Sequence, residues 1–230
     1  MLYKMLYELG QKIKRIRELG DRFVKRGKAV ASKLLGKDIS RLSTEAKLMA
    51  KFASMVYGTR ANVDAYIFHK ELSNPKRGVW INEQLKRVVI AERGTDPKSK
   101  GGLEDIAHDA LIVIGKPEMI DRNKTELKFV EKMHEQYPDY TIFLSGHSLG
   151  ASVIYEVLRL LSDVSYIGSA YAFNAGIGKV EQHPNFKKVN NMHIAGDPIS
   201  AMSRFLKTRV NDTYKQKEGT ANPHTIDNFI

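Results

Sequence analysis

The stretch 142-IFLSGHSLGASVIYEVLRLL-161 joins a short apolar run to a Gly-x-Ser-x-Gly pentapeptide and then to a segment with helical spacing. The apolar run predicts a buried strand, and apolar side chains at steps of three and four in the second half predict a helix. Gly146 and Gly150 lie two residues before and two after Ser148, where glycine lets strand and helix approach closely. The stretch therefore predicts a strand, a tight turn with Ser148 at its apex, and a helix.

Strands and helices are expected to alternate around this stretch. Ser43 or Thr44 can cap a helix that stops near Gly58. The other expected helix is 125–136, and the other expected strands are about 64–69, 78–81, 86–92, 141–145, 166–173 and 189–195. The alternation predicts an α/β fold with a mixed, mostly parallel sheet, helices on both faces, and functional loops at the C-terminal ends of the strands.

The charge of the chain is concentrated near its N-terminus. The 230 residues, 42% of them hydrophobic, suffice for one substantial globular domain with an appended segment. The net charge is +11, and residues 1–40 contain eleven Lys or Arg against four Asp or Glu. We expect two parts: a basic amphipathic helical segment at 1–40 and a main domain at 41–230.

Residues 1–35 carry apolar side chains on one helical stripe and basic side chains largely on other faces. Such a helix can pack on the main domain, on a second copy, or on an anionic membrane surface. Nucleic acid is not an expected partner, because no aromatic platform accompanies the charge. No uncharged apolar run reaches the roughly 20 residues of a spanning helix, and no secretory signal is evident, which favours an intracellular or peripheral membrane location.

Metal and cofactor motifs are not found. The chain has no cysteine, so thiol ligands and thiol nucleophiles are excluded. His134-Glu135 lacks the second histidine of a zinc protease motif, and the glycines before Lys179 lack the rest of a phosphate loop. We expect neither a metal nor an organic cofactor.

A reactive serine needs an imidazole to take its proton and a carboxylate to orient that imidazole. In α/β-hydrolases these follow in the order Ser, Asp, His. Asp197 directly follows a predicted strand in 192-MHIAGDPIS-200, whereas Asp163 ends a helix and Asp212 lies in a polar segment. Asp197 is therefore the predicted acid.

Three histidines follow Ser148. His183 precedes the acid, His193 lies within a predicted strand, and His224 follows the acid in the loop 222-NPHTIDNF-229. The order favours His224 as the base. The backbone N–H of Leu149 is the first expected oxyanion donor, and the second is expected from the loop 93-RGTDP-97.

Five motifs in this order resemble the class 3 lipase family, the fungal-lipase-like branch of the α/β-hydrolases, over about residues 44–230. They are RGTD at 93–96, GHSLG at 146–150, FNAG at 173–176, GDP at 196–198 and the late histidine. The resemblance implies an α/β-hydrolase catalytic domain at 41–230 with Ser148 as nucleophile, Asp197 as acid and His224 as base. It also implies that Thr95 and Leu149 form the oxyanion hole.

By this resemblance the chain is expected to be a carboxylic ester hydrolase of the triacylglycerol lipase or phospholipase type, acting on lipid-like esters through an acyl-enzyme. The alternative is a non-catalytic module of the same fold that binds an anionic membrane or a protein through its basic N-terminal helix. Glu92 departs from the family pattern by replacing an apolar residue. The loop after Thr95 has no large apolar residue before Leu103, which argues against an amphipathic lid there.

Overall fold

The computed structural model describes residues 36–95, 117–175, 183–197, 199, 212–220 and 222–230. A seven-stranded sheet runs through them, with the strands in sequence order from one edge to the other. The strands are β1 (Ile67–Phe68), β2 (Arg77–Asn82), β3 (Arg87–Glu92), β4 (Thr141–His147), β5 (Ile167–Phe173), β6 (Val189–Ile194) and β7 (Asp212–Tyr214). Strand β2 pairs antiparallel with both β1 and β3, and β3 to β7 pair in parallel, which confirms the mixed, mostly parallel sheet.

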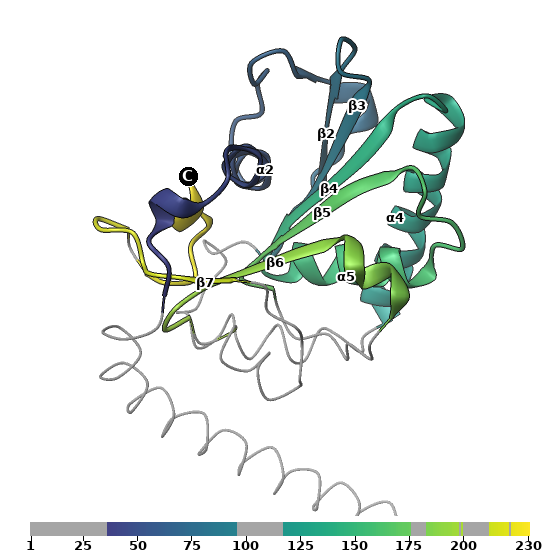
Figure 1. The fold of residues 1–230 in the computed structure, drawn as a ribbon. Coiled ribbons are helices and arrows are strands. Elements are labelled where there is room, and N and C mark those ends of the chain that lie inside the picture. The colour runs from purple at the N-terminus through teal and green to yellow at the C-terminus, as the bar shows by residue number, and fades with distance from the viewer. Residues whose placement is uncertain (1–35, 96–116, 176–182, 198, 200–211, 221) are drawn as a thin grey trace, which may run out of the picture.

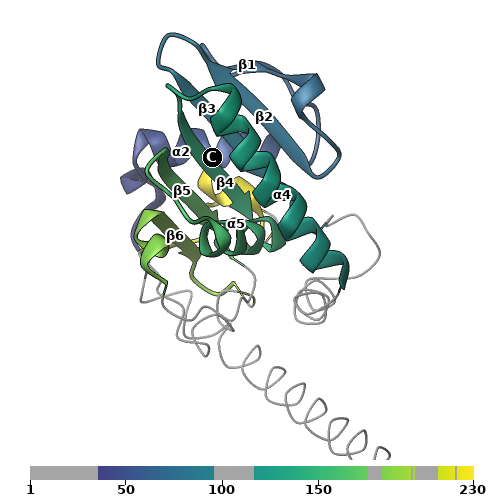
Figure 2. The same cartoon turned by 90° about the vertical axis from the view of Figure 1, so that its right-hand side faces the viewer.

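Helices cover both faces of the sheet, as expected. Helix α2 (Thr44–Met55) lies on one face, and α4 (Pro117–Gln136) and α5 (Leu149–Leu160) lie on the other (Figures 1 and 2). Four short 3-10 helices complete the described elements: η1 (Ile39–Arg41), η2 (Lys70–Leu72), η3 (Pro184–Lys188) and η4 (Ile226–Phe229). The predicted cap of α2 is confirmed, because the Ser43 side chain accepts a hydrogen bond from the Ala46 backbone N–H at 3.1 Å.

Two hydrophobic clusters hold these layers together. In β3, Val88 and Ile90 face α4 and α5, while Val89 and Ala91 face α2, so the alternation of the strand supplies both clusters. Trp80 is fully buried in the α2 cluster. A shift of a strand by one residue would turn the side chains of each cluster to the opposite face of the sheet. The two clusters therefore fix the register of the strands, and with it the alignment of the strand ends.

Two elements differ from the prediction. Helix α4 begins at Pro117, well before residue 125. Its first turns bury the charged side chain of Arg122, so no continuous apolar stripe marks these turns as helical in the sequence. Strand β7 was not predicted, since three residues are too few to show a period. It pairs with β6 on one side and with Lys37 on the other. Lys37 donates its backbone N–H to the Thr213 carbonyl and accepts from the Lys215 N–H, at 2.8 and 2.9 Å.

Some predictions fall on residues that the structure does not describe. The helix of residues 1–35 and the loop after Thr95 are among them, so the segment boundary near residue 40 and the missing amphipathic lid stay predictions. Within the described parts of the chain, no helix is long and apolar enough to cross a membrane.

Candidate active site

Ser148 occupies the turn between β4 and α5. Its backbone has φ 56° and ψ −124°, and its N–H donates to the Phe173 carbonyl at 3.0 Å. The turn needs both flanking glycines. A Cβ on Gly150 would lie 2.1 Å from the Glu92 carbonyl oxygen, and one on Gly146 would lie 2.6 Å from the Gly150 carbonyl carbon. The chain therefore forms the tight strand–turn–helix that the pentapeptide predicts.

His224 and Asp197 form a buried pair. The His224 Nδ1 atom lies 3.0 Å from Asp197 Oδ1, and the two side chains are 6% and 0% exposed. Asp197 Oδ1 also accepts the Ile199 backbone N–H at 3.3 Å, which fixes the carboxylate. Because an ionised carboxylate only accepts hydrogen bonds, the proton of the neutral imidazole lies on Nδ1 and the lone pair lies on Nε2.

Two side-chain atoms of the candidate site are buried without a hydrogen-bond partner among the described residues. Within the residues that the structure describes, neither Ser148 Oγ nor His224 Nε2 makes a hydrogen bond. Their chain segments are adjacent, because the rings of His147 and His224 lie 4.8 Å apart between centroids. Buried polar atoms are nearly always bonded, and in substrate-free enzymes the nucleophile–base bond often tightens only on binding. The two atoms are thus available for proton transfer.

Asn174 anchors the loop that carries His224. Its side-chain N–H groups donate to the carbonyls of Pro223 and His224 at 3.1 and 3.2 Å, and its Oδ1 accepts the Ile194 N–H at 2.9 Å. Asn174 directly follows β5 and has φ 45°. The FNAG motif thus provides an asparagine that ties the His224 loop to the ends of β5 and β6.

A second chain of hydrogen bonds runs through His147. Its Nε2 lies 2.6 Å from the His224 carbonyl oxygen, so Nε2 carries the proton and Nδ1 accepts from the Tyr57 hydroxyl at 3.2 Å. Tyr57 in turn accepts the Gly94 N–H at 2.8 Å. Burial, with His224 close by, lowers the pKa of His147 to about 3, which keeps it neutral. Sequence reasoning missed Tyr57, because nothing in its spacing signals a partner ninety residues away.

One expected oxyanion donor, Leu149, lies at the same turn, and the loop that contains the other, Thr95, lies against it. Leu149 is the first residue of α5, where backbone N–H groups lack intrahelical partners. A Cβ on Gly94 would lie 3.2 Å from the Leu149 nitrogen and 2.6 Å from the His147 carbonyl oxygen, so the loop of residues 93–95 lies against the turn. Thr95 follows Gly94 and is partly buried. The arrangement suits two N–H groups that receive one developing negative charge.

A buried ion pair braces that loop. Arg122 of α4 donates to the Glu92 carboxylate at 2.9 Å and to the Arg93 carbonyl at 2.7 Å. A second buried pair joins Arg77 of β2 to Glu126 of α4. Burial and the nearby Glu126 raise the pKa of Glu92, and Arg122 opposes them. Glu92, which replaces the apolar residue of the family pattern, thus pairs with Arg122. Arg122 lies too far along the chain for sequence spacing to reveal this pair.

The other candidates lie elsewhere. His193 is fully buried and bonds Asn191 at 2.8 Å, and His183 accepts the Asn185 N–H at the start of η3. Asp163 is exposed and bonds Ser165, and Asp212 pairs with Lys37. Within the described ranges no group of three His, Cys, Asp or Glu could hold a metal ion.

One protein of known sequence is similar to half of this chain. The chain matches no family model. It is similar to the GDSL esterase/lipase At4g10955 of Arabidopsis thaliana, with 26% identity over 117 residues. These are 50% of this chain but only 33% of that relative, so the chain spans about a third of its length.

Two solved lipase structures align with most of this chain. The Lip2 lipase of Yarrowia lipolytica aligns with a TM-score of 0.50 and 14% identity, over 80% of this chain and 81% of that one. A triacylglycerol lipase of Penicillium expansum aligns at 0.49 and 16%, over 79% and 81%. The strand order, the helices on both faces and the likeness to Lip2 together show that this chain has the α/β-hydrolase fold found in fungal lipases.

Proposed function

We propose that the chain is a serine ester hydrolase of lipid-like carboxylic esters, of the triacylglycerol lipase or phospholipase type, with Ser148, His224 and Asp197 as its triad. The observation that carries the proposal is the buried His224–Asp197 pair beside a serine in a strained turn, with the serine oxygen and the imidazole Nε2 both unpartnered within the described residues. The family resemblance and the names of the similar proteins support the lipid-like ester class.

The reaction would proceed in two halves. Ser148 Oγ attacks the ester carbonyl carbon as its proton passes to His224 Nε2, and the N–H groups of Leu149 and Thr95 receive the oxyanion. The C–O bond to the alcohol breaks, and His224 returns the proton to the leaving alkoxide. Water then attacks the acyl-enzyme with His224 as base again, releasing the carboxylic acid and free Ser148.

The test compares two buried serines. Ser148→Ala should lower kcat for a soluble short-chain ester by at least about a thousandfold and abolish labelling by a fluorophosphonate probe. Ser152→Ala is the matched control, because Ser152 is also buried and lies one turn along α5. It should keep both signals. Unchanged hydrolysis and labelling in purified Ser148→Ala would refute the proposed nucleophile.

A further inference from the structure

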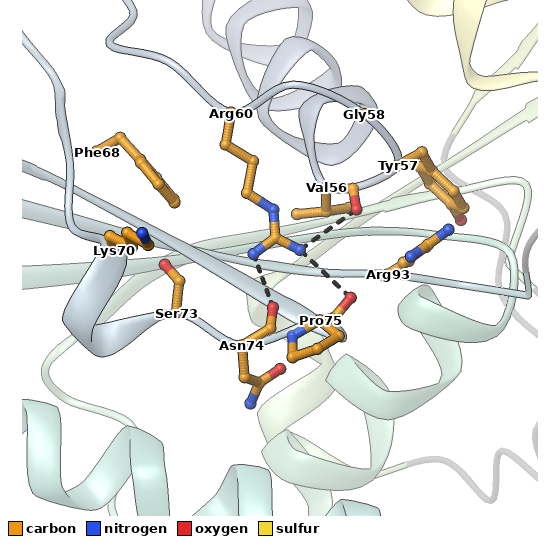
Figure 3. Close-up of a pocket in the computed structure, with 10 residues that line it drawn as sticks. All are labelled: Val56, Tyr57, Gly58, Arg60, Phe68, Lys70, Ser73, Asn74, Pro75 and Arg93. Atoms are coloured by element: carbon orange, nitrogen blue, oxygen red, sulfur yellow. Dashed lines mark hydrogen bonds between the residues drawn. The ribbon is translucent and has the colours of Figure 1, made fainter.

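Tyr57 lies in the turn that follows α2, and its hydroxyl reaches the candidate active site. The backbone of this turn is held in place. The Tyr57 N–H donates to the Ser54 carbonyl at 3.0 Å. The Arg60 guanidinium donates to the carbonyl of Val56 at 3.4 Å and to that of Pro75 at 3.3 Å, which ties the turn to the loop before β2 (Figure 3). The Tyr57 side chain therefore starts from a fixed point.

The Tyr57 hydroxyl accepts one hydrogen bond and donates another. It accepts the Gly94 N–H at 2.8 Å and lies 3.2 Å from His147 Nδ1. Because the neutral His147 carries its proton on Nε2, its Nδ1 atom can only accept, so the Tyr57 proton points to Nδ1. The His147 carbonyl is a more distant acceptor at 3.5 Å. One hydroxyl thus joins the loop of residues 93–95, the candidate oxyanion loop, to the His147 ring.

The His147 ring carries this connection on to the loop of residues 222–225, the His224 loop. The His147 Nε2–H donates to the His224 carbonyl at 2.6 Å, and the Asn174 side chain donates to the same carbonyl at 3.2 Å. Which nitrogen of a neutral imidazole carries the proton is set by the hydrogen bond that the other nitrogen makes. The Tyr57 proton at Nδ1 therefore keeps the His147 proton on Nε2, where it bonds the His224 loop.

The candidate oxyanion loop packs closely on this hydroxyl. A Cβ on Gly94 would lie 2.5 Å from the Tyr57 hydroxyl oxygen. Two further contacts act on the residue before it: Arg122 donates to the Arg93 carbonyl at 2.7 Å, and the Arg93 guanidinium lies over the Tyr57 ring, 5.4 Å from its centroid (Figure 3). The bond from Gly94 to Tyr57 thus holds the loop directly before Thr95, the expected second oxyanion donor.

We propose that Tyr57 is a positioning residue that aligns the candidate oxyanion loop with the His224 loop. The oxyanion donors and the base act on the same tetrahedral intermediate, so a change in their relative position weakens oxyanion binding or proton transfer. A hydroxyl suits this role, because it accepts on one side and donates on the other. The effect on rate rests on the proposed ester hydrolase function, whereas the alignment itself can be measured without a substrate.

The first experiment is Tyr57→Phe, which removes the hydroxyl and keeps the ring. For a soluble short-chain ester, kcat should fall at least about tenfold while KM stays within about twofold of wild type. Tyr171→Phe is the matched control, because the Tyr171 hydroxyl also bonds α2, at the opposite end of the helix, by donating to Glu45 at 2.9 Å. It should lower the thermal stability and keep kcat. An unchanged kcat in Tyr57→Phe, a loss confined to KM, or an equal loss of kcat in Tyr171→Phe would overturn the proposal.

A double-mutant cycle tests the connection through His147. His147→Gln removes the Nδ1 acceptor and keeps a side-chain N–H donor. Two residues that act through one chain of hydrogen bonds have non-additive effects. Tyr57→Phe should therefore lower kcat about threefold in the His147→Gln background, against at least about tenfold in the wild-type background. The same fold-loss in both backgrounds would overturn the connection to the His224 loop.

Nuclear magnetic resonance of the full chain tests the alignment without any ester. In Tyr57→Phe, the Gly94 amide should exchange with solvent about tenfold faster than in wild type. The imidazole ¹⁵N signals of His147 and His224 should change, and Tyr171→Phe should leave all these signals unaltered. Wild-type signals in Tyr57→Phe would refute the alignment. If the wild-type chain hydrolyses no ester, the proposed function fails, and these signals alone decide whether Tyr57 connects the two loops.

Discussion

At the scale of single residues, the candidate site contains two of the buried side-chain atoms that have no hydrogen-bond partner among the described residues. Ser148 Oγ and His224 Nε2 lack hydrogen bonds within the described residues, whereas Asp197, Asn174 and His147 are each held by hydrogen bonds to two or more neighbours. A buried polar group without a partner costs about 1–3 kcal/mol. In the proposed triad, the two atoms that would exchange a proton carry this cost.

The lowered pKa of His147 predicts that the stability of the fold depends on pH. Its pKa is about 3 in the fold and 6.5 without the fold's influence, so between these values the unfolded chain binds a proton that the native chain does not. The free energy of unfolding should therefore fall as pH falls below 6.5. Urea unfolding at pH 7.5, 5.5 and 4.5 should show a decline about 1.4 kcal/mol per pH unit steeper in wild type than in His147→Gln. Equal slopes in wild type and His147→Gln would contradict a lowered pKa of His147 in the fold.

The buried pair of Arg122 and Glu92 predicts a non-additive pair of substitutions. Arg122→Met leaves a buried carboxylate without its cation and should lower the free energy of unfolding by about 3–5 kcal/mol. The double variant Glu92→Met/Arg122→Met removes both charges and should recover most of that loss. Chemical denaturation of the two variants beside wild type measures this. A double variant less stable than Arg122→Met would show that the unpaired Glu92 carboxylate does not cause the loss of stability in Arg122→Met.

At the scale of elements, three neighbouring parallel strands each end in a residue of the site. Ser148 follows β4, Asn174 follows β5, and Asp197 lies just after β6. Parallel strands place their C-terminal ends at one edge of the sheet, so these residues meet although they are dozens of positions apart. His224 reaches the same edge from a loop, and its position depends on the contacts of Asn174 and His147 with that loop.

The close approach of α5 to β3 can be tested at one glycine. Gly150→Ala would place a Cβ 2.1 Å from the Glu92 carbonyl oxygen, so strand and helix must separate. We expect a loss of several kcal/mol of stability and of most of the activity. Gly58→Ala is the control, because its Cβ would meet nothing within 4 Å. In thermal unfolding and ester hydrolysis, Gly58→Ala should stay near wild type; equal damage from both substitutions would argue against the steric cause.

At the scale of the whole molecule, local patterns predicted the layers and chain order predicted the candidate triad. Apolar periodicity is a local signal, so β3, β4 and α5 were found nearly to the residue. The Tyr57–His147 bond and the Arg122–Glu92 pair were not predicted, because contacts between distant residues leave no period in the sequence. Strand β7 was missed because its partners, rather than its own three residues, make it a strand.

We expect the basic N-terminal segment to contribute to membrane binding and not to ester hydrolysis. Deleting residues 1–35 should weaken binding to vesicles of anionic lipid, since these residues carry most of the excess positive charge. Hydrolysis of a soluble short-chain ester should be preserved, because the proposed triad and the contacts that the structure describes for it lie beyond residue 36. Vesicle sedimentation and an ester assay on both forms measure this. Equal vesicle binding before and after the deletion would contradict it.

The backbone of Ser148 has a consequence for protein engineering. Its positive φ is a conformation that glycine adopts without strain and serine does not, at a cost of about 1–3 kcal/mol. A library selected only for heat resistance should therefore enrich glycine at position 148 and lose the proposed nucleophile with it. Directed evolution of this chain needs a selection for turnover in every round, because at this one position thermostability and reactivity favour different residues.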